Sequence, residues 1–115
     1  MPITIYGIKN CDTMKKARAV LDKKGVLYDF HDYKTQGIER AKLEGWAKKV
    51  GWETLLNKAG TTFRKLPGKD KEALTENKAI ALMLAQPSMI KRPVLELGGG
   101  KVLVGFKPED YAGLR

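Results

Sequence analysis

The chain has 115 residues, of which 43% are hydrophobic and 30% are charged, and its formal net charge is +9. This length predicts a single domain, and no apolar run approaches the ~20 residues of a membrane-spanning helix, so a membrane protein is excluded. One cysteine cannot form an internal disulfide, and no secretory leader is recognisable, so we expect a cytoplasmic protein.

Residues 3–21 predict a strand, a short loop and a helix. Branched and aromatic residues favour a strand over residues 3–6, and Gly7 and Asn10 interrupt this run. Apolar residues then recur at three- and four-residue spacing, as on one face of a helix: Met14, Ala17, Val20 and Leu21. Basic residues and Gly25 follow, which indicates the end of the helix.

The only cysteine, Cys11, stands where this helix begins. Unpaired backbone N–H groups and the positive end of the helix dipole lie at such a position, and Lys15 and Lys16 follow one turn later. All three features favour the thiolate over the thiol, so the position predicts a nucleophile. The alternative is a buried, unreactive cysteine that packs as a small hydrophobic residue.

Residues 27–33 predict a second strand, because aromatic and apolar residues there alternate with aspartates. A strand–helix–strand connection favours a parallel pair with a right-handed crossover. The only histidine, His31, falls within this strand. Because it has no partner at metal-binding spacing, we interpret it as a half-exposed strand residue without a catalytic role.

Residues 38–90 predict a block of helices. The segment from Ile38 to Gly51 has one apolar and one charged face, and a longer helix ends before Pro87. Short helical turns are expected at residues 52–56 and 70–74, and loops at residues 34–37, 57–62 and 67–69. We expect the tryptophans and methionines of this block to belong to the core.

Residues 94–104 predict an antiparallel hairpin that turns at its three glycines, and a short helix is expected after Pro108. The glycine run is not a phosphate-binding loop, because Leu95 and Val102 occupy positions that such a loop fills with Gly and with Ser or Thr. The predicted order is β-α-β, a helical block, then β-β-α around a small mixed sheet. We therefore predict an α/β, thioredoxin-like fold: one domain over residues 1–115, with residues 38–90 as a helical insertion.

The positive charge of the chain predicts an attraction to anions, whether oxyanions, an acidic tripeptide such as glutathione, nucleic acid or an acidic protein. The lysines are spread over several segments, without an aromatic-flanked cluster or a recognition helix. Nucleic acid is therefore the disfavoured partner.

Four segments together resemble the arsenate-reductase-like family, which includes arsenate reductases, the Spx regulators and the YffB group. They are Tyr6–Ala17 (YGIKNCDTMKKA), Gly60–Leu66 (GTTFRKL), Ile90–Val94 (IKRPV) and Val104–Lys107 (VGFK). The resemblance covers essentially the whole chain, and the first segment is most similar to the YffB group. It implies the same thioredoxin-like fold.

The resemblance also implies roles for individual residues. Cys11 would be the thiolate that attacks an electrophilic arsenic or sulfur atom. Arg64 and Arg92 would bind the anion, since a guanidinium offers paired donors and lowers the pKa of a neighbouring thiol. Pro93 would be the cis-proline of thioredoxin-like folds, which places the backbone before it against bound glutathione. Without the resemblance, the ordinary alternative for either arginine is a surface ion pair.

Three further positions qualify this assignment. Asn10 has two interpretations, contact with a ligand carboxylate or N-capping of the helix. Met14 occupies the place of the second cysteine of thioredoxins and Spx, so the resolving sulfur must come from outside, and glutathione suits a basic pocket. Lys107 stands where arsenate reductases carry a third arginine; it keeps the charge without the bidentate geometry, which disfavours arsenate as the physiological substrate.

We therefore predict a glutathione-dependent thiol reductase or arsenate reductase-like oxidoreductase, with Cys11 as nucleophile. Asn10, Arg64, Arg92 and Lys107 would hold the anion. The predicted co-substrate is glutathione, the substrate is a small oxyanion or disulfide, and no metal is expected. The alternative is a Spx-like regulatory module that binds RNA polymerase or another acidic protein, because a shared fold does not fix function.

Overall fold

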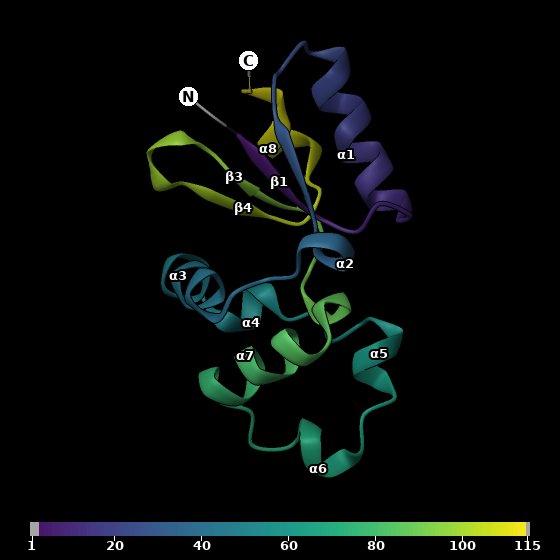
Figure 1. Cartoon of the computed structure of the whole chain (residues 1–115), viewed down its shortest axis with the longest axis vertical. Helices are drawn as coiled ribbons and strands as arrows, with labels where there is room; N and C mark the ends of the chain where they lie inside the picture. The colour runs from purple at the N-terminus through teal and green to yellow at the C-terminus, as the bar shows by residue number, and fades with distance from the viewer. Residues whose placement is uncertain (1–2, 115) are drawn as a thin grey trace. The chain divides into compact units, whose positions relative to one another are not determined.

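The computed structural model describes residues 3–114 (Figure 1). The chain divides into two compact units, which we call the sheet unit (Met1–Gln36 and Arg92–Arg115) and the helical unit (Gly37–Lys91). The helical unit begins and ends close to the predicted insertion. That the whole chain folds as one domain stays a prediction.

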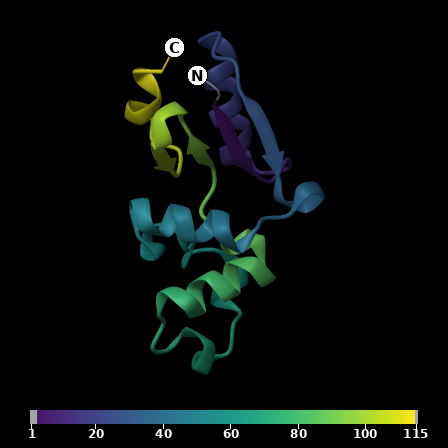
Figure 2. The same cartoon turned by 60° about the vertical axis from the view of Figure 1, so that its left-hand side comes forward.

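The sheet unit contains a four-stranded mixed sheet in the order β2-β1-β3-β4 (Figures 1 and 2). β1 (Thr4–Gly7) pairs in parallel with β2 (Asp29–Asp32) and antiparallel with β3 (Val94–Glu96), which forms a hairpin with β4 (Val102–Val104). The hairpin turns through η2 (Gly98–Gly100), where Gly99 has a φ of 82° that favours glycine. The predicted small mixed sheet and thioredoxin-like fold are confirmed.

Two helices of the sheet unit share one hydrophobic core. α1 (Asp12–Lys23) contributes Met14, Ala17 and Leu21, and α8 (Pro108–Ala112) contributes Tyr111. These side chains pack with Ile5 of β1 and Leu95 of β3, which stand opposite each other in the sheet. Both helices therefore pack on the sheet face that carries Ile5. The apolar periodicity predicted for α1 is confirmed.

The second strand is shorter than predicted. It begins at Asp29 and ends at Asp32, because β1 offers only four residues for pairing. Leu27 lies outside it and is 90% exposed. Tyr33, predicted as the end of this strand, instead begins α2 (Tyr33–Gln36). The loop predicted at residues 34–37 is therefore wrong for residues 34–36, which are helical. The carboxylate of Asp32 accepts a hydrogen bond from the backbone N–H of Lys34 (2.9 Å) and so stabilises the turn into α2.

The helical unit consists of six helices and turns between Arg40 and Met89. They are α3 (Arg40–Val50), α4 (Trp52–Leu55), α5 (Thr61–Arg64), α6 (Gly68–Lys71), α7 (Glu76–Ala85) and the 3-10 helix η1 (Pro87–Met89). Gly51 ends α3 and Gln86 ends α7, close to the predicted positions. The predicted turn at residues 70–74 lies instead at Gly68–Lys71, so Gly68 and Lys69 are helical where a loop was predicted.

Within the helical unit, the segment that follows α4 runs antiparallel to the segment that follows η1. Leu56 and Ile90 form an isolated β-bridge. The backbone N–H of Asn57 donates to the carbonyl of Met89 (2.8 Å), and that of Lys91 donates to the carbonyl of Leu55 (2.7 Å). The chain that leads into Arg92 is thus held by backbone hydrogen bonds up to Lys91.

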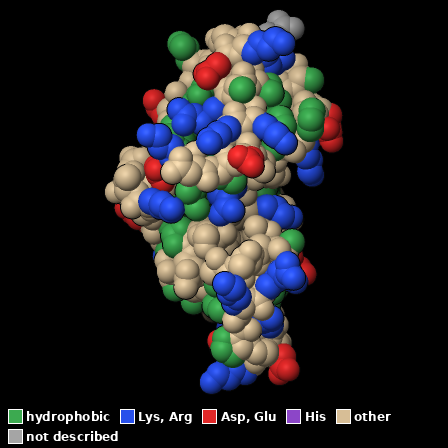
Figure 3. Space-filling model, turned by 90° about the vertical axis from the view of Figure 1, so that its right-hand side faces the viewer, with side chains coloured by type: hydrophobic (Ala, Val, Ile, Leu, Met, Phe, Trp, Pro, Cys, Tyr) green, Lys and Arg blue, Asp and Glu red, His purple; other side chains and the backbone are tan. Residues whose placement is uncertain are grey.

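The positive charge is dispersed on the face shown in Figure 3. On the face shown in Figure 3, Lys and Arg side chains are spread from top to bottom, with Asp and Glu among them. Within residues 3–114, no helix is both long and apolar enough to cross a membrane.

Candidate active site

Cys11 is the N-cap residue of α1, with extended backbone angles (φ −134°, ψ 128°). Its carbonyl accepts a hydrogen bond from the backbone N–H of Lys15 (2.9 Å), which closes the first helical turn. The thiol is free and partly exposed. The sulfur therefore stands where a helix presents unpaired N–H groups, as predicted from the sequence.

Opposing effects act on the thiol of Cys11. Burial raises its pKa, whereas four effects lower it: a hydrogen bond from the Met14 N–H, a hydrogen bond from the Arg92 guanidinium, the charge of Arg92 and a hydrogen bond from the Thr13 N–H. Together they hold the pKa of Cys11 below its ordinary value. A larger fraction of this thiol is therefore thiolate, which is the nucleophilic form.

Arg92 and Pro93 reach this site from the start of β3. The Arg92–Pro93 peptide bond is cis, as the resemblance implies. Pro93 is buried, and its carbonyl accepts a hydrogen bond from the backbone N–H of Gly105 (2.9 Å). Because Val94 pairs with Tyr6, the segment before β3 lies at the sheet edge where β1 ends and the loop to Cys11 starts.

The lysines of α1 contribute less to stabilising the Cys11 thiolate than the sequence suggests. Lys15 and Lys16 are exposed to solvent, and neither is among the groups that lower the pKa of Cys11. Water screens the charges of exposed side chains strongly. The cation that acts on the thiol is instead Arg92, from the other end of the sheet unit's sequence.

Asn10 and Lys107 flank helices of the sheet unit. Asn10 is exposed and precedes the N-cap, which is Cys11 itself, so the interpretation of Asn10 as N-cap is wrong. Lys107 is the exposed N-cap residue of α8, and its carbonyl accepts a hydrogen bond from the N–H of Asp110 (2.9 Å). Lys107 is not one of the groups that lower the pKa of Cys11. Contact of either side chain with an anion stays a prediction.

Arg64 belongs to the helical unit, unlike the other predicted site residues. It is the last residue of α5, and its side chain is exposed. Its carbonyl accepts a hydrogen bond from the ammonium group of Lys71 in α6 (2.8 Å), which ties the two short helices together. A role of Arg64 in anion binding stays a prediction.

Met14 holds the position at which the resemblance led us to look for a second cysteine. Its side chain is fully buried in the core of the sheet unit. Gly7, the last residue of β1, leaves room for it, because a Cβ at position 7 would overlap the Met14 sulfur and methyl group. Met14 therefore contributes packing through its side chain and a hydrogen bond to Cys11 through its backbone.

Sequence reasoning did not single out Tyr33. This residue follows β2, and its buried ring packs against Tyr6 (ring centroids 6.4 Å apart) and His31 (6.0 Å). The signal that could have found it is its place beyond the carboxyl end of a strand parallel to β1, where α/β sheets tend to bind ligands. His31 lies in β2 and is half-exposed, as predicted.

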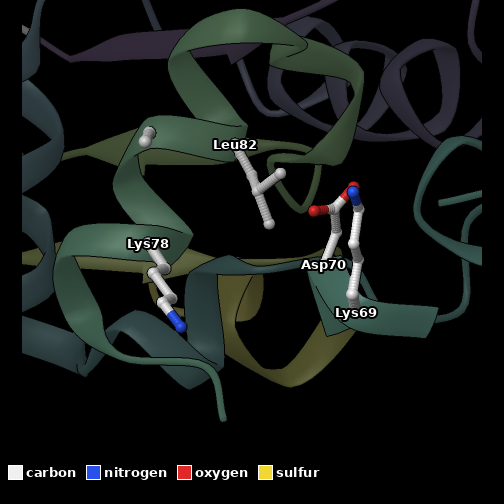
Figure 4. Close-up of a pocket in the computed structure, with 5 residues that line it drawn as sticks. Lys69, Asp70, Lys78 and Leu82 are labelled. Atoms are coloured by element: carbon white, nitrogen blue, oxygen red, sulfur yellow. The ribbon is translucent and has the colours of Figure 1, made fainter. Parts of the chain in front are cut away.

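Two further features of the described residues concern possible binding sites elsewhere in the chain. Within residues 3–114, no group of three or more His, Cys, Asp or Glu side chains could hold a metal ion. A cavity of about 310 Å³ lies between α6 and α7 of the helical unit (Figure 4). It is lined by Lys69, Asp70, Lys78, Ala81 and Leu82. Its charged side chains are all exposed, and none of the predicted site residues lines it.

Comparison with known proteins places these features in a family. The model of the ArsC family matches residues 6–114. A solved structure titled YffB protein is 64% identical, with a TM-score of 0.93 over 97% of each chain. An arsenate reductase (ArsC) related protein from Brucella melitensis is 58% identical, with a TM-score of 0.80 over 96% of this chain and 92% of that one. An uncharacterised protein of Haemophilus influenzae is 39% identical over 95% of each chain.

More distant relatives include proteins with different described functions. The global transcriptional regulator Spx of Streptococcus mutans is 24% identical over 94% of this chain and 79% of its own. An arsenate reductase from Vibrio cholerae is 19% identical and shares the fold, with a TM-score of 0.83. The same scaffold thus occurs in proteins described as reductases and as regulators.

Proposed function

Because the chain belongs to the ArsC family, we propose that it is a glutathione-dependent thiol reductase with Cys11 as its nucleophile. The family and its arsenate reductase-like members support an oxidoreductase. The observation that carries the finer proposal is the contact of Arg92 with the Cys11 thiol, because it lowers the pKa of that thiol and brings a cation to the nucleophile.

The proposed reaction is a thiol–disulfide exchange. The Cys11 thiolate attacks one sulfur of a substrate disulfide, the S–S bond breaks, and the other half of the substrate leaves as a thiolate. A glutathione thiolate then attacks the substrate sulfur of the mixed disulfide and restores the Cys11 thiolate. A second glutathione releases the substrate thiol and forms glutathione disulfide, so two glutathione molecules supply the two electrons.

External glutathione is proposed because no second cysteine is available. Cys11 is the only cysteine of the chain, and Met14 holds the position that would otherwise carry the resolving thiol. Arg92 would bind a carboxylate of glutathione or a substrate oxyanion, with Arg64, Lys107 and Asn10 as further proposed contacts. Pro93 would position glutathione against the backbone. These reactants suit the cytoplasm, where we propose that the protein acts.

The rate of Cys11 alkylation against pH, with and without glutathione, tests the proposal. We expect an alkylation pKa below the ~8.5 of an ordinary cysteine and slower alkylation when glutathione is present. Turnover of a mixed disulfide between glutathione and a small thiol is then measured directly. An ordinary pKa without protection by glutathione would contradict the proposed reductase.

A second function, binding of RNA polymerase or another acidic protein, is favoured by the similarity to Spx and by the net charge of +9. The direct test is binding of the purified chain to purified RNA polymerase at two salt concentrations. Salt-sensitive binding that persists in Cys11→Ser would support the regulatory function, whereas absence of binding leaves the reductase as the proposal.

A further inference from the structure

Two buried hydroxyl groups of residues 3–114 have no hydrogen-bond partner, those of Tyr33 and Tyr111. Such groups are rare, because a buried donor without a partner costs about 1–3 kcal/mol. Both tyrosines belong to the sheet unit, but their surroundings differ. Tyr111 lies in the hydrophobic core with its ring against Phe106, and the charged group that acts on it is Asp110. The charged groups that act on Tyr33 are Arg92 and Glu96.

The sheet register places Tyr33 at the edge that carries Cys11. Asp32, the residue before Tyr33, pairs with Gly7, the last residue of β1 before the loop to Cys11. On the other side of β1, Tyr6 pairs with Val94, two residues after Arg92. The end of β2, the end of β1 and the start of β3 therefore meet at one edge.

Neighbouring side chains hold the Tyr33 ring in place. It is stacked on Tyr6 with an angle of 27° between the ring planes and meets His31 edge-on. The Tyr6 hydroxyl donates a hydrogen bond to Glu96 Oε1 (2.7 Å), so Tyr6 is itself fixed. The Tyr33 side chain is only 3% exposed. The ring that carries the Tyr33 hydroxyl is thus buried and packed against two aromatic neighbours.

Arg92 is the charged group that acts on both the Tyr33 phenol and the Cys11 thiol. Its charge lowers the pKa of the Cys11 thiol and also acts on the Tyr33 phenol. Burial raises the pKa of Tyr33, the electrostatic interactions with Tyr6 and Glu96 raise it further, and Arg92 opposes this rise. The phenol therefore stays neutral at physiological pH, and its oxygen can accept a hydrogen bond from a cation.

We propose that Tyr33 is a positioning residue for Arg92, and that its phenol oxygen accepts the guanidinium whenever Cys11 is not a thiolate. The proposal rests on the proposed function, in which Cys11 alternates between thiolate and mixed disulfide. In the exchange with glutathione disulfide, the Cys11 thiolate attacks one sulfur, the Cys11–glutathione bond forms and the other glutathione leaves as thiolate. This step removes the negative charge that Arg92 contacts.

Tyr33 then stabilises the uncharged states of Cys11 relative to the thiolate. When Cys11 loses its negative charge, the Arg92 guanidinium loses one anionic acceptor in a partly buried site, and the Tyr33 phenol oxygen offers a further acceptor that offsets part of this loss. The phenol oxygen supplies this acceptor in both the protonated and the mixed-disulfide forms. Removing the oxygen should therefore favour the thiolate and lower the pKa of Cys11. A mutation that merely disturbed the packing around Arg92 should have the opposite effect and raise this pKa.

The test compares Tyr33→Phe with Tyr111→Phe, a matched control that removes the other buried, unpartnered hydroxyl of the same unit. Alkylation against pH gives the pKa of Cys11, and equilibration with glutathione disulfide gives the constant for mixed-disulfide formation. We expect Tyr33→Phe to lower the pKa of Cys11 below that of the wild type. We also expect it to reduce the mixed-disulfide constant about three- to tenfold, and Tyr111→Phe to change neither.

A second background separates the proposed contact from a general packing effect. With Arg92→Ala already present, Tyr33→Phe should no longer change either quantity, because its partner is absent. An unchanged or raised pKa of Cys11 in Tyr33→Phe would overturn the proposal. If the wild type forms no mixed disulfide with glutathione, the proposed function fails, but the pKa comparison still decides the role of Tyr33.

Discussion

The guanidinium of Arg92 donates a hydrogen bond to the thiol of Cys11 and so joins the N-terminal and C-terminal segments of the sheet unit at one edge of its sheet. Arg92 provides two of the four effects that lower the pKa of this thiol, its hydrogen bond and its charge. The N–H groups of Thr13 and Met14 come with the helix that Cys11 begins, whereas the cation is provided only when β3 pairs with β1. The part of the activation that Arg92 provides therefore depends on tertiary folding.

Replacement of Arg92 by alanine should raise the pKa of Cys11, because both the hydrogen bond and the charge that lower it are lost. Arg92→Lys should give an intermediate value, since lysine keeps the charge without the planar donors. Alkylation against pH measures both variants. Arg18→Ala is the matched control, because Arg18 contacts Tyr28 and Phe30 instead. Equal pKa values in Arg92→Ala and the wild type would contradict the role of this arginine.

Cys11→Ser should abolish thiol–disulfide exchange, and it should also change how stability depends on pH. In the wild type, the pKa of Cys11 is lower in the folded than in the unfolded chain, whose thiol titrates near ~8.5. Between these two values the unfolded chain holds a proton that the folded chain has released. The free energy of unfolding of the wild type should therefore rise with pH in this window.

Urea unfolding at several pH values tests this expectation. The pH-dependent part of the stability difference between the wild type and Cys11→Ser should be zero below the folded-state pKa of Cys11, grow as the pH rises toward ~8.5 and stay constant above it. A difference that is independent of pH would mean that the folded state does not favour the thiolate. Turnover that persists in Cys11→Ser would exclude Cys11 as the nucleophile.

Much of the sheet unit follows from local pattern. Branched residues before Gly7, helical periodicity from Met14 onward and the glycine run at residues 98–100 are each sufficient to predict a strand, a helix and a hairpin turn. The candidate nucleophile follows as well, because a thiol at a helix start is recognisable in sequence. These features depend on residues that are close together in the chain.

What could not be predicted depends on pairing between distant segments. The apolar pattern of residues 27–33 does not reveal that only Asp29–Asp32 find partners on β1, so Tyr33 was expected to end a strand and not to begin α2. The aromatic cluster of Tyr6, His31 and Tyr33 exists only once this register is set. The electrostatic interaction of Arg92 with Tyr33 in this cluster could therefore not be predicted from the sequence.

Gly7→Ala should destabilise the chain by about 1–3 kcal/mol, the usual cost of adding a methyl group to a well-packed core. The reason is that a Cβ at this position would overlap the side chain of Met14, which is fully buried. Gly45→Ala is the matched control, because it lies inside α3 with open space around its Cα and should stabilise by about 0.5–1 kcal/mol.

A double mutant tests whether the cost of Gly7→Ala comes from the contact with Met14. In a Met14→Ala background the cost of Gly7→Ala should shrink markedly, since the overlapping sulfur and methyl group are gone. Urea denaturation of the wild type, Gly7→Ala, Met14→Ala and the double mutant gives the coupling free energy between the two positions. Equal costs of Gly7→Ala in both backgrounds would show that the strain at position 7 comes from another neighbour.

Tyr111→Phe should leave stability at neutral pH unchanged or raise it by up to about 1 kcal/mol, because the variant removes a buried hydroxyl without a hydrogen-bond partner.

The larger effect of Tyr111→Phe is expected at alkaline pH. Burial, with a smaller contribution from Asp110, raises the pKa of Tyr111 to about 12, compared with ~10 in the unfolded chain. Between these values the folded chain holds a proton that the unfolded chain has released, so the stability of the wild type should fall as the pH rises. Tyr111→Phe should lose less stability over the same range, and unfolding followed by circular dichroism at each pH measures the difference. Parallel losses in the two proteins would show that Tyr111 does not titrate differently in the folded and unfolded states.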